Sequence, residues 1–171
     1  MSALTPQPPS VWRSFGVRRA TERRPPPPAL RELVDVIPVG RSARRGEVTL
    51  TLLSVERYGD GFVALFRLLQ EHTAPDPALI AAPPMPELRL QVIDDRSGAY
   101  DAWPHGGGGG GGHGLLDWRL GYVFAPAPDP GVRELRLTAA EIAWRRFDQE
   151  HSDLVDAGTT PGPWTFVVPL A

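Results

Sequence analysis

Cysteine is absent from the 171 residues of this chain. This absence excludes a thiol nucleophile, a disulfide framework and every zinc site with cysteine ligands. Lysine is absent too, so all 18 basic residues are arginines and a Walker-type phosphate loop is excluded. No apolar run approaches the about 18 residues of a membrane span, and the N-terminus lacks the apolar segment of a secretory signal. The sequence as written predicts a soluble, cytoplasmic protein.

Catalytic signatures are also missing. The sequence contains no Gly-x-Ser-x-Gly, dinucleotide-binding or His-Glu-x-x-His motif. Without such a motif, no nucleophile, cofactor cradle or metal pair can be assigned. We therefore expect no enzymatic activity and no cofactor.

Charge and proline divide the chain unevenly. Residues 1–45 carry nine arginines against three acids, a charge of +6, whereas residues 46–171 carry nine against 17, a charge of −8. Seven of the 20 prolines precede residue 29, including the run Pro25 to Pro28, which favours an extended polyproline rod. We predict a disordered, basic, proline-rich arm over residues 1–32 and one folded domain over residues 33–171.

The arm interleaves aromatic and basic side chains in a way typical of binding segments. Arginine contacts phosphates or acidic surfaces, and an aromatic ring stacks on a base or inserts into a membrane interface. The alternative is a solubilising tail without a partner. The candidate interaction residues are Trp12, Arg13, Phe15, Arg18, Arg19, Arg23 and Arg24.

Beyond the arm, apolar residues alternate with polar ones. The clearest run is Leu116, Trp118, Leu120, Tyr122 and Phe124. Similar alternation recurs over residues 48–52, 88–92 and 164–170. A period of two places one row of side chains in a core and the other in water. The chain therefore predicts an all-β fold, a single antiparallel β-sandwich of about seven to eight strands. The five aromatics expected in its core are Trp118, Tyr122, Phe124, Trp164 and Phe166.

Local signals place several elements. Gly59-Asp60-Gly61 predicts a tight hairpin turn, and Pro38 and Pro169 predict edge strands because proline cannot donate to a central ladder. Asp94 and Asp95 read as part of a turn.

Residues 138–147 are ambiguous. The spacing of Thr138 and Glu141 allows a helix, but the neighbouring β pattern favours a strand that would bury Trp144. Residues 148–162, rich in breakers, are expected to form a loop.

Three segments together resemble a known kind of domain. They are Val-Ile-Pro-Val-Gly at 36–40, Val-Thr-Leu-Thr-Leu at 48–52 followed by the Asp-Gly hairpin, and Gly-Pro-Trp-Thr-Phe at 162–166. Their order is similar to that in uncharacterised bacterial immunoglobulin-like domains, which are often attached to membrane-anchored or regulatory proteins. The resemblance covers about residues 34–170 and implies an immunoglobulin-like sandwich with no active site. The chain departs from antibody-type domains in lacking their cysteine pair.

Two groups of residues are candidate metal ligands. His105 and His113 bracket seven glycines, Gly106–Gly112, and could close on zinc, copper or nickel. Ordering glycines is entropically unfavourable, so we expect a plain solvent loop there. Asp148, Glu150 and Asp153 supply the oxygen ligands that calcium prefers, although such a cluster is also typical of a solvated face.

Surface positions complete the candidates. Trp103, beside Pro104 and the glycine run, is a candidate exposed anchor for a partner, with packing over one end of the sandwich as the alternative. Five arginines alternate with apolar residues and should face outward, and the first three would form a binding stripe if they shared one sheet. They are Arg67, Arg89, Arg119, Arg133 and Arg136.

These observations favour a noncatalytic accessory module that binds another protein through end loops, an exposed sheet edge or the arm. One alternative is a metal-binding protein or metal-dependent enzyme that uses His105, His113 and the acids. Another is attachment to an anionic membrane or to nucleic acid through the basic arm.

Overall fold

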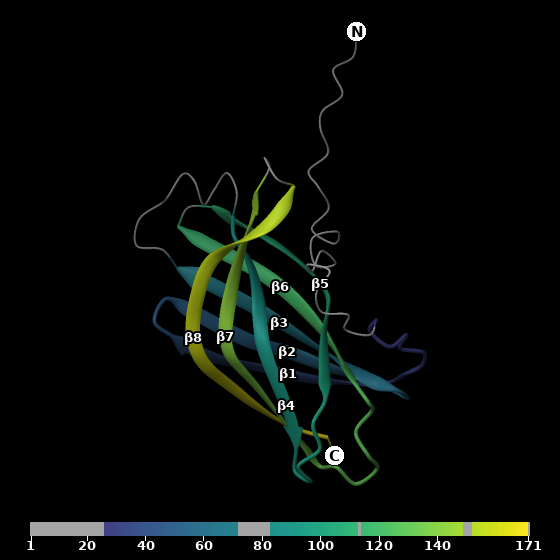
Figure 1. Cartoon of the computed structure of the whole chain (residues 1–171). Helices are drawn as coiled ribbons and strands as arrows, with labels where there is room; N and C mark the ends of the chain where they lie inside the picture. The colour runs from purple at the N-terminus through teal and green to yellow at the C-terminus, as the bar shows by residue number, and fades with distance from the viewer. Residues whose placement is uncertain (1–25, 72–82, 113, 149–151, 171) are drawn as a thin grey trace.

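A computed structural model describes residues 26–71, 83–112, 114–148 and 152–170 (Figure 1). The secondary structure of these residues is entirely β, which confirms the predicted class and strand number. The eight strands are β1 (Leu33–Arg45), β2 (Val48–Tyr58), β3 (Gly61–Glu71), β4 (Met85–Asp94), β5 (Asp101–Gly112), β6 (Leu115–Ala125), β7 (Glu134–Asp148) and β8 (Asp153–Pro169). Within the described ranges, no helix has the length and apolar character needed to cross a membrane.

The strands form two antiparallel sheets that share one core. The larger sheet has the order β1-β2-β3-β6-β5, and the smaller has the order β4-β7-β8. Along one side of the molecule, β1 of the larger sheet lies next to β8 of the smaller. On the other side, an isolated bridge between Ile93 and Ala99 links the end of β4 to the segment that enters β5.

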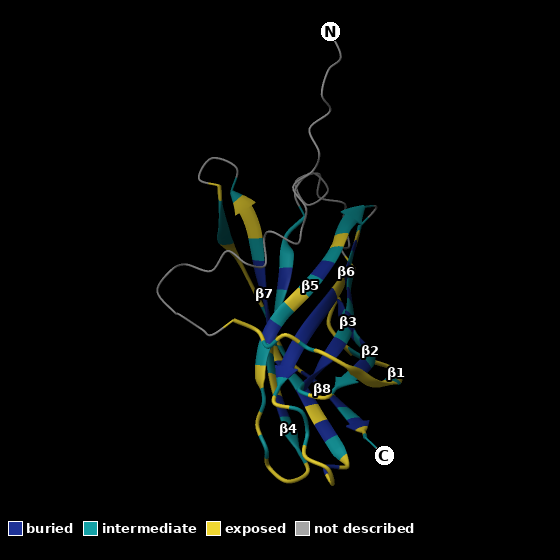
Figure 2. Ribbon diagram, turned by 90° about the vertical axis from the view of Figure 1, so that its right-hand side faces the viewer, coloured by how far each residue is buried: buried dark blue, intermediate teal, exposed yellow. Residues whose placement is uncertain are grey.

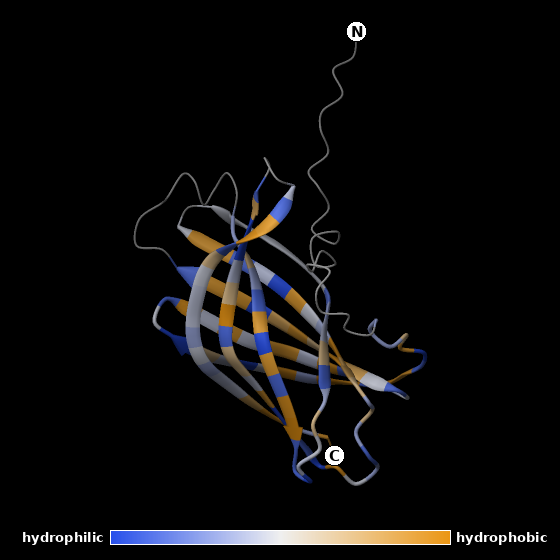
Figure 3. Cartoon of the chain, in the orientation of Figure 1, coloured by the Kyte–Doolittle hydropathy of each residue, from blue (hydrophilic) through white to orange (hydrophobic). Residues whose placement is uncertain are grey.

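Alternation of side chains explains why these segments become strands. On β6 the inward residues from Leu116 to Phe124 are at most 3% exposed, whereas Asp117 and Arg119 face outward. The same alternation of apolar and polar residues is visible along the central strands in Figure 3. No charged or polar residue is buried in the described part of the chain. The core is therefore stabilised by apolar burial from both sheets.

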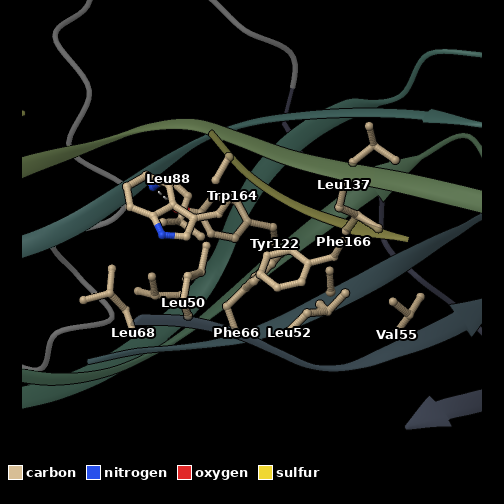
Figure 4. Close-up of a cluster of buried hydrophobic side chains, with 14 of the residues drawn as sticks. Leu50, Leu52, Val55, Phe66, Leu68, Leu88, Tyr122, Leu137, Trp164 and Phe166 are labelled. Atoms are coloured by element: carbon tan, nitrogen blue, oxygen red, sulfur yellow. Dashed lines mark hydrogen bonds between the residues drawn. The ribbon is translucent and has the colours of Figure 1, made fainter. Parts of the chain in front are cut away.

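Aromatic rings connect the two sheets. The ring of Phe66 on β3 lies 6.2 Å from that of Tyr122 on β6 and 6.1 Å from that of Phe166 on the facing sheet. Figure 4 shows these side chains packed among leucines of both sheets. All five aromatics predicted for the core are buried there, and Trp144 is buried with them.

The turn and edge predictions are confirmed. Tyr58 pairs with Gly61, so Gly59 and Asp60 form the two-residue turn between β2 and β3. The strands that contain Pro38 and Pro169, β1 and β8, each lie at the edge of a sheet. Residues 138–147 form a strand as favoured, because β7 continues through them to Asp148.

The loop predicted over residues 148–162 is wrong at Asp148, which ends β7, and from Asp153 onward, where β8 has begun. β8 begins at Asp153 and pairs with β7 through Thr159 and Thr160. The pairing of β7 with β8 contains two register shifts. Pro161 and Pro163 are tolerated in β8 because it is an edge strand, which needs no backbone donor on its outer side.

Truncating an inward side chain should destabilise the protein far more than truncating its outward neighbour. Leu137→Ala removes a fully buried side chain from the core and should lower the free energy of unfolding by about 2–5 kcal/mol. Arg136→Ala, one residue away and exposed, should change it by less than about 0.5 kcal/mol. Urea denaturation of both variants measures the difference, and equal effects would contradict the alternation.

Candidate functional site

The glycine run is a strand, so the predicted solvent loop is wrong. Gly106–Gly112 forms most of β5 and pairs with β6, from Gly106 opposite Gly121 to Gly112 opposite Leu115. Pairing with β6 supplies backbone hydrogen bonds along the run, which offset the entropy lost by ordering glycine.

The two faces of this strand have different steric requirements. Gly109 lies opposite Trp118 in the inward row, where a Cβ atom would overlap the carbonyl oxygen of Asp117 and lie 2.7 Å from Trp118 Cα. Gly108, Gly110 and Gly112 belong to the outward row, where a Cβ atom would meet nothing within 4 Å. Close packing against β6 therefore requires glycine at position 109 but not at the outward positions.

Beyond β5 the larger sheet ends. Among the described residues, no strand pairs with the outer side of Gly106–Gly112 (Figure 2). Such an edge presents unpaired N–H and C=O groups, and the seven glycines themselves carry no side chain, proline ring or charge that would protect them. We call Gly106–Gly112 the glycine edge.

The border between β1 and β8 is protected by arginines. Arg41 Nη1 donates to the carbonyl oxygen of Val167 at 3.1 Å, and Arg45 Nε donates to that of Pro163. Arg57 Nη1 donates to the carbonyl oxygen of Leu170 at 3.4 Å. These side chains satisfy backbone acceptors at and just beyond the edge of the smaller sheet.

The β4 border is protected differently. The backbone N–H of Leu88 donates to the hydroxyl oxygen of Tyr122 at 2.7 Å, which brings a side chain of the larger sheet onto the edge of β4. Pro86 and a register shift after Arg89 interrupt the same strand. β5 also has a proline and a register shift, at Pro104 and between Pro104 and Gly106, but both precede the glycine edge, and neither occurs within Gly106–Gly112.

Charged side chains line the outer face beside the glycine edge. Arg67 binds Asp117 with two hydrogen bonds, Nε to Oδ1 at 3.0 Å and Nη2 to Oδ2 at 2.7 Å. These hydrogen bonds are the largest cause of a lowered pKa at Asp117. Arg119 lies opposite Gly108, is exposed and has no hydrogen bond or ion pair within the described residues. Leu115, opposite Gly112, is 39% exposed.

The stripe considered for three arginines forms only in part. Arg67 and Arg119 are direct cross-strand neighbours on the larger sheet. Arg89 lies on β4 in the smaller sheet, where Glu87 and Glu141 are its ion partners. Arg133 and Arg136 are exposed as predicted.

Trp103 is not an exposed anchor, so that prediction is wrong. Its side chain is 9% exposed. It pairs with Val123, which pairs with Val63, and both valines are buried on the outer face of the larger sheet, outside the main core. The prediction failed because it assumed a loop after Pro104, whereas residues 101–112 continue as a strand that fixes the direction of this ring.

Of the metal candidates, His105, Asp148 and Asp153 lie among the described residues. His105 is exposed on β5, while Asp148 and Asp153 face each other across β7 and β8 of the other sheet. His113 and Glu150 lie outside the described residues, as do all seven candidates of the arm, from Trp12 to Arg24. No group of three or more histidine or acidic side chains that could hold a metal ion occurs in the described ranges.

The turn before β5 is built on Asp94, as predicted. Tyr100 donates its hydroxyl proton to Asp94 Oδ2 at 2.6 Å, and the backbone N–H groups of Arg96 and Gly98 donate to Asp94 Oδ1 at 2.8 Å. These bonds, that of Tyr100 foremost, lower the pKa of Asp94. The turn therefore fixes where the chain leaves β4 and enters β5.

Comparison with known proteins indicates the fold alone. No family model matches the chain, and no curated protein matches it. The chain is similar to a solved structure described as the conserved domain protein from Bacillus anthracis, with a TM-score of 0.54 and 14% identity. The match covers 80% of this chain and 49% of the other, so the chain spans about half the length of that protein.

Substitutions along the glycine edge should separate its two faces. Gly109→Val places a branched side chain against Asp117 and Trp118, so it should destabilise the protein, by roughly 1–3 kcal/mol as for other overpacked sites. Gly110→Val points into open space and adds β propensity, so it should be neutral or stabilising by up to about 1 kcal/mol. Urea denaturation checks both, and a strongly destabilising Gly110→Val would contradict this register.

Acid should weaken the Asp94 turn. Because its pKa is lower than the ordinary value of 3.8, the stability that Asp94 contributes is complete at neutral pH. That contribution should fall as the pH drops below 3.8 and vanish below the lowered pKa of Asp94. Asp94→Asn should have a lower melting temperature than the parent at pH 7, but its melting temperature should fall less on acidification to pH 2.5. Tyr100→Phe should show an intermediate melting temperature at pH 7 and an intermediate fall. Thermal melts across this range test the order, and identical acid dependence in all three proteins would refute it.

Proposed function

We propose that this chain is a noncatalytic module with an immunoglobulin-like fold, which binds another protein by adding an extended segment of that protein to the glycine edge. Strand addition uses the backbone groups of an exposed sheet edge for affinity and neighbouring side chains for specificity.

The strand order supports the immunoglobulin-like assignment. Constant-type immunoglobulin domains have one sheet of strands A-B-E-D and a second of C-F-G. Strands β2 to β8 have the same pattern, because β2-β3-β6-β5 faces β4-β7-β8. In this correspondence β1 is an additional edge strand, and the glycine edge lies on strand D. The ring contact between Phe66 on β3 and Phe166 on β8 joins the two sheets, which have no disulfide because the chain has no cysteine.

The unprotected glycine edge is the observation that carries the proposal. Proteins usually cover, shorten, charge or interrupt such edges, because they recruit strands from other chains. All four edge strands contain a proline, at Pro38, Pro86, Pro104 and Pro161, and arginines also reach β8. After Pro104 and its register shift, however, β5 continues through seven glycines without a further interruption. The contrast between this uninterrupted stretch and the other edges supports the proposal that it is an interaction surface.

The energetics favour a reversible complex. Each backbone hydrogen bond adds a net stabilisation of about 0.5–1.5 kcal/mol, and a segment along seven glycines can form several. Association opposes this with about 4–15 kcal/mol of lost freedom. Backbone bonding alone is therefore marginal, and the side chains beside the edge must decide which segment binds.

Selection from a displayed library of random nine-residue peptides tests the proposal. Peptides that bind should slow hydrogen exchange at the amides of Gly106–Gly112. Because the chain has no cysteine, Gly110→Cys offers a unique position for an environment-sensitive dye, with Thr159→Cys on β8 as the matched control. The dye at position 110 should respond to the selected peptides, and the dye at position 159 should not.

Two results would overturn the proposal. One is a library that yields no binding peptide against the folded protein. The other is a set of peptides that protect amides of a different strand and leave those of Gly106–Gly112 unchanged.

A further inference from the structure

The outer face beside the glycine edge also constrains the sequence of the bound segment, provided that the proposed strand addition occurs. We infer that this segment carries an apolar residue followed four positions later by a carboxylate, received by Leu115 and Arg119 respectively.

Glycine leaves this face open to an incoming strand. A strand added to β5 would lie about 10 Å from β6, two strand spacings away. Gly108 and Gly112 stand between the new strand and the side chains of Arg119 and Leu115, and neither glycine has a side chain to block the path. A long side chain such as arginine, met by a glutamate from the other side, spans this distance.

The charges on this face select a carboxylate. Arg67 is already bound to Asp117 at 2.7 Å, and Arg44 is bound to Glu71 at 2.7 Å. Arg119 takes part in neither pair and has no hydrogen bond or ion pair within the described residues, although its charge also contributes to the lowered pKa of Asp117. A carboxylate opposite Gly108 would give it a partner, whereas a lysine or arginine there would be repelled.

The position of the bound segment between the apolar residue and the carboxylate is selective as well. Gly110 lies opposite Asp117. A carboxylate facing Gly110 would approach Asp117, which is ionised and already paired. The face therefore accepts an apolar residue at Gly112, an uncharged residue at Gly110 and an acid at Gly108.

Chain direction fixes the order of these residues. Every pairing in both sheets is antiparallel. A segment added antiparallel to β5 meets Gly112 before Gly108. The apolar residue must then precede the carboxylate in the bound segment.

Defined peptides test this inference directly. The reference is a nine-residue peptide of threonines with leucine at its third position and glutamate at its seventh, labelled for fluorescence anisotropy. Replacing the glutamate by glutamine should weaken binding about two- to fivefold, the range of an exposed ion pair. Moving the glutamate to the fifth position, opposite Gly110 and towards Asp117, should weaken binding at least as much. Exchanging the leucine and the glutamate should have a similar effect.

Charge reversal in the protein provides the matched control. Arg119→Glu should prefer the lysine version of the peptide to the glutamate version, and Arg119→Gln should show no preference. Arg146→Glu reverses an exposed arginine on β7 of the other sheet and should keep the parent's preference. Thermal melts establish that all three variants are folded.

The outcomes separate the two proposals. If all the peptides bind equally and protect the glycine amides, strand addition holds and the inferred selectivity is wrong. If none binds and library selection also fails, the proposed function fails with it. A preference for glutamate that survives in Arg119→Glu would overturn the role of Arg119.

Discussion

Burial of alternate side chains between two sheets of unequal width is the constraint on which the rest of the structure depends. The inward residues of β2, β3 and β6 are buried against the smaller sheet. The two outermost strands of the larger sheet lie at the margin of this core. Leu33, Val34 and Val36 on β1 are at least half exposed, and β5 has glycine in place of inward side chains along most of its length. The width mismatch therefore produces two marginal strands whose backbone groups need other partners.

The chain meets this need in opposite ways at its two sides. Beside β1, guanidinium groups reach across the border to backbone carbonyls on and just after β8. Arginine suits this role because its planar group offers several donors in fixed directions, whereas lysine offers a single ammonium. Beside β5, backbone pairing with β6 and the anchoring turn at Asp94 and Tyr100 hold the strand in place. Within the described ranges, side chains thus cover the margin at β1, whereas the margin at β5 leaves a row of backbone groups unpaired.

The sequence predicted those parts of the fold in which side chains carry a periodic signal. The alternation from Leu116 to Phe124 identified β6 and its inward face, and Gly59-Asp60-Gly61 identified a hairpin by its conformational needs. A run of glycines has no periodicity, so the sequence does not predict that residues 106–112 form a strand. The direction of the Trp103 side chain depends on that strand and could not be predicted either. The candidate site could not be predicted for the same reason: Arg119 and Leu115 were recognisable as strand residues, but their place beside an open edge depends on β5 being a strand. β8 was shortened in prediction because its prolines signal breaks, although edge strands tolerate them.

Steric fit alone does not account for the composition of β5. Glycine is required opposite Trp118, but the outward positions have room for any side chain. Each of those glycines weakens the strand by about 0.5–1 kcal/mol relative to alanine, so the fold would be more stable without them. A side chain at position 108 or 112 would stand between Arg119 or Leu115 and any strand added outside β5. The outward glycines therefore lower the stability of the isolated domain while leaving the side chains of β6 accessible from the outer side of β5. This is the arrangement expected of an edge whose specificity comes from the second strand rather than the first.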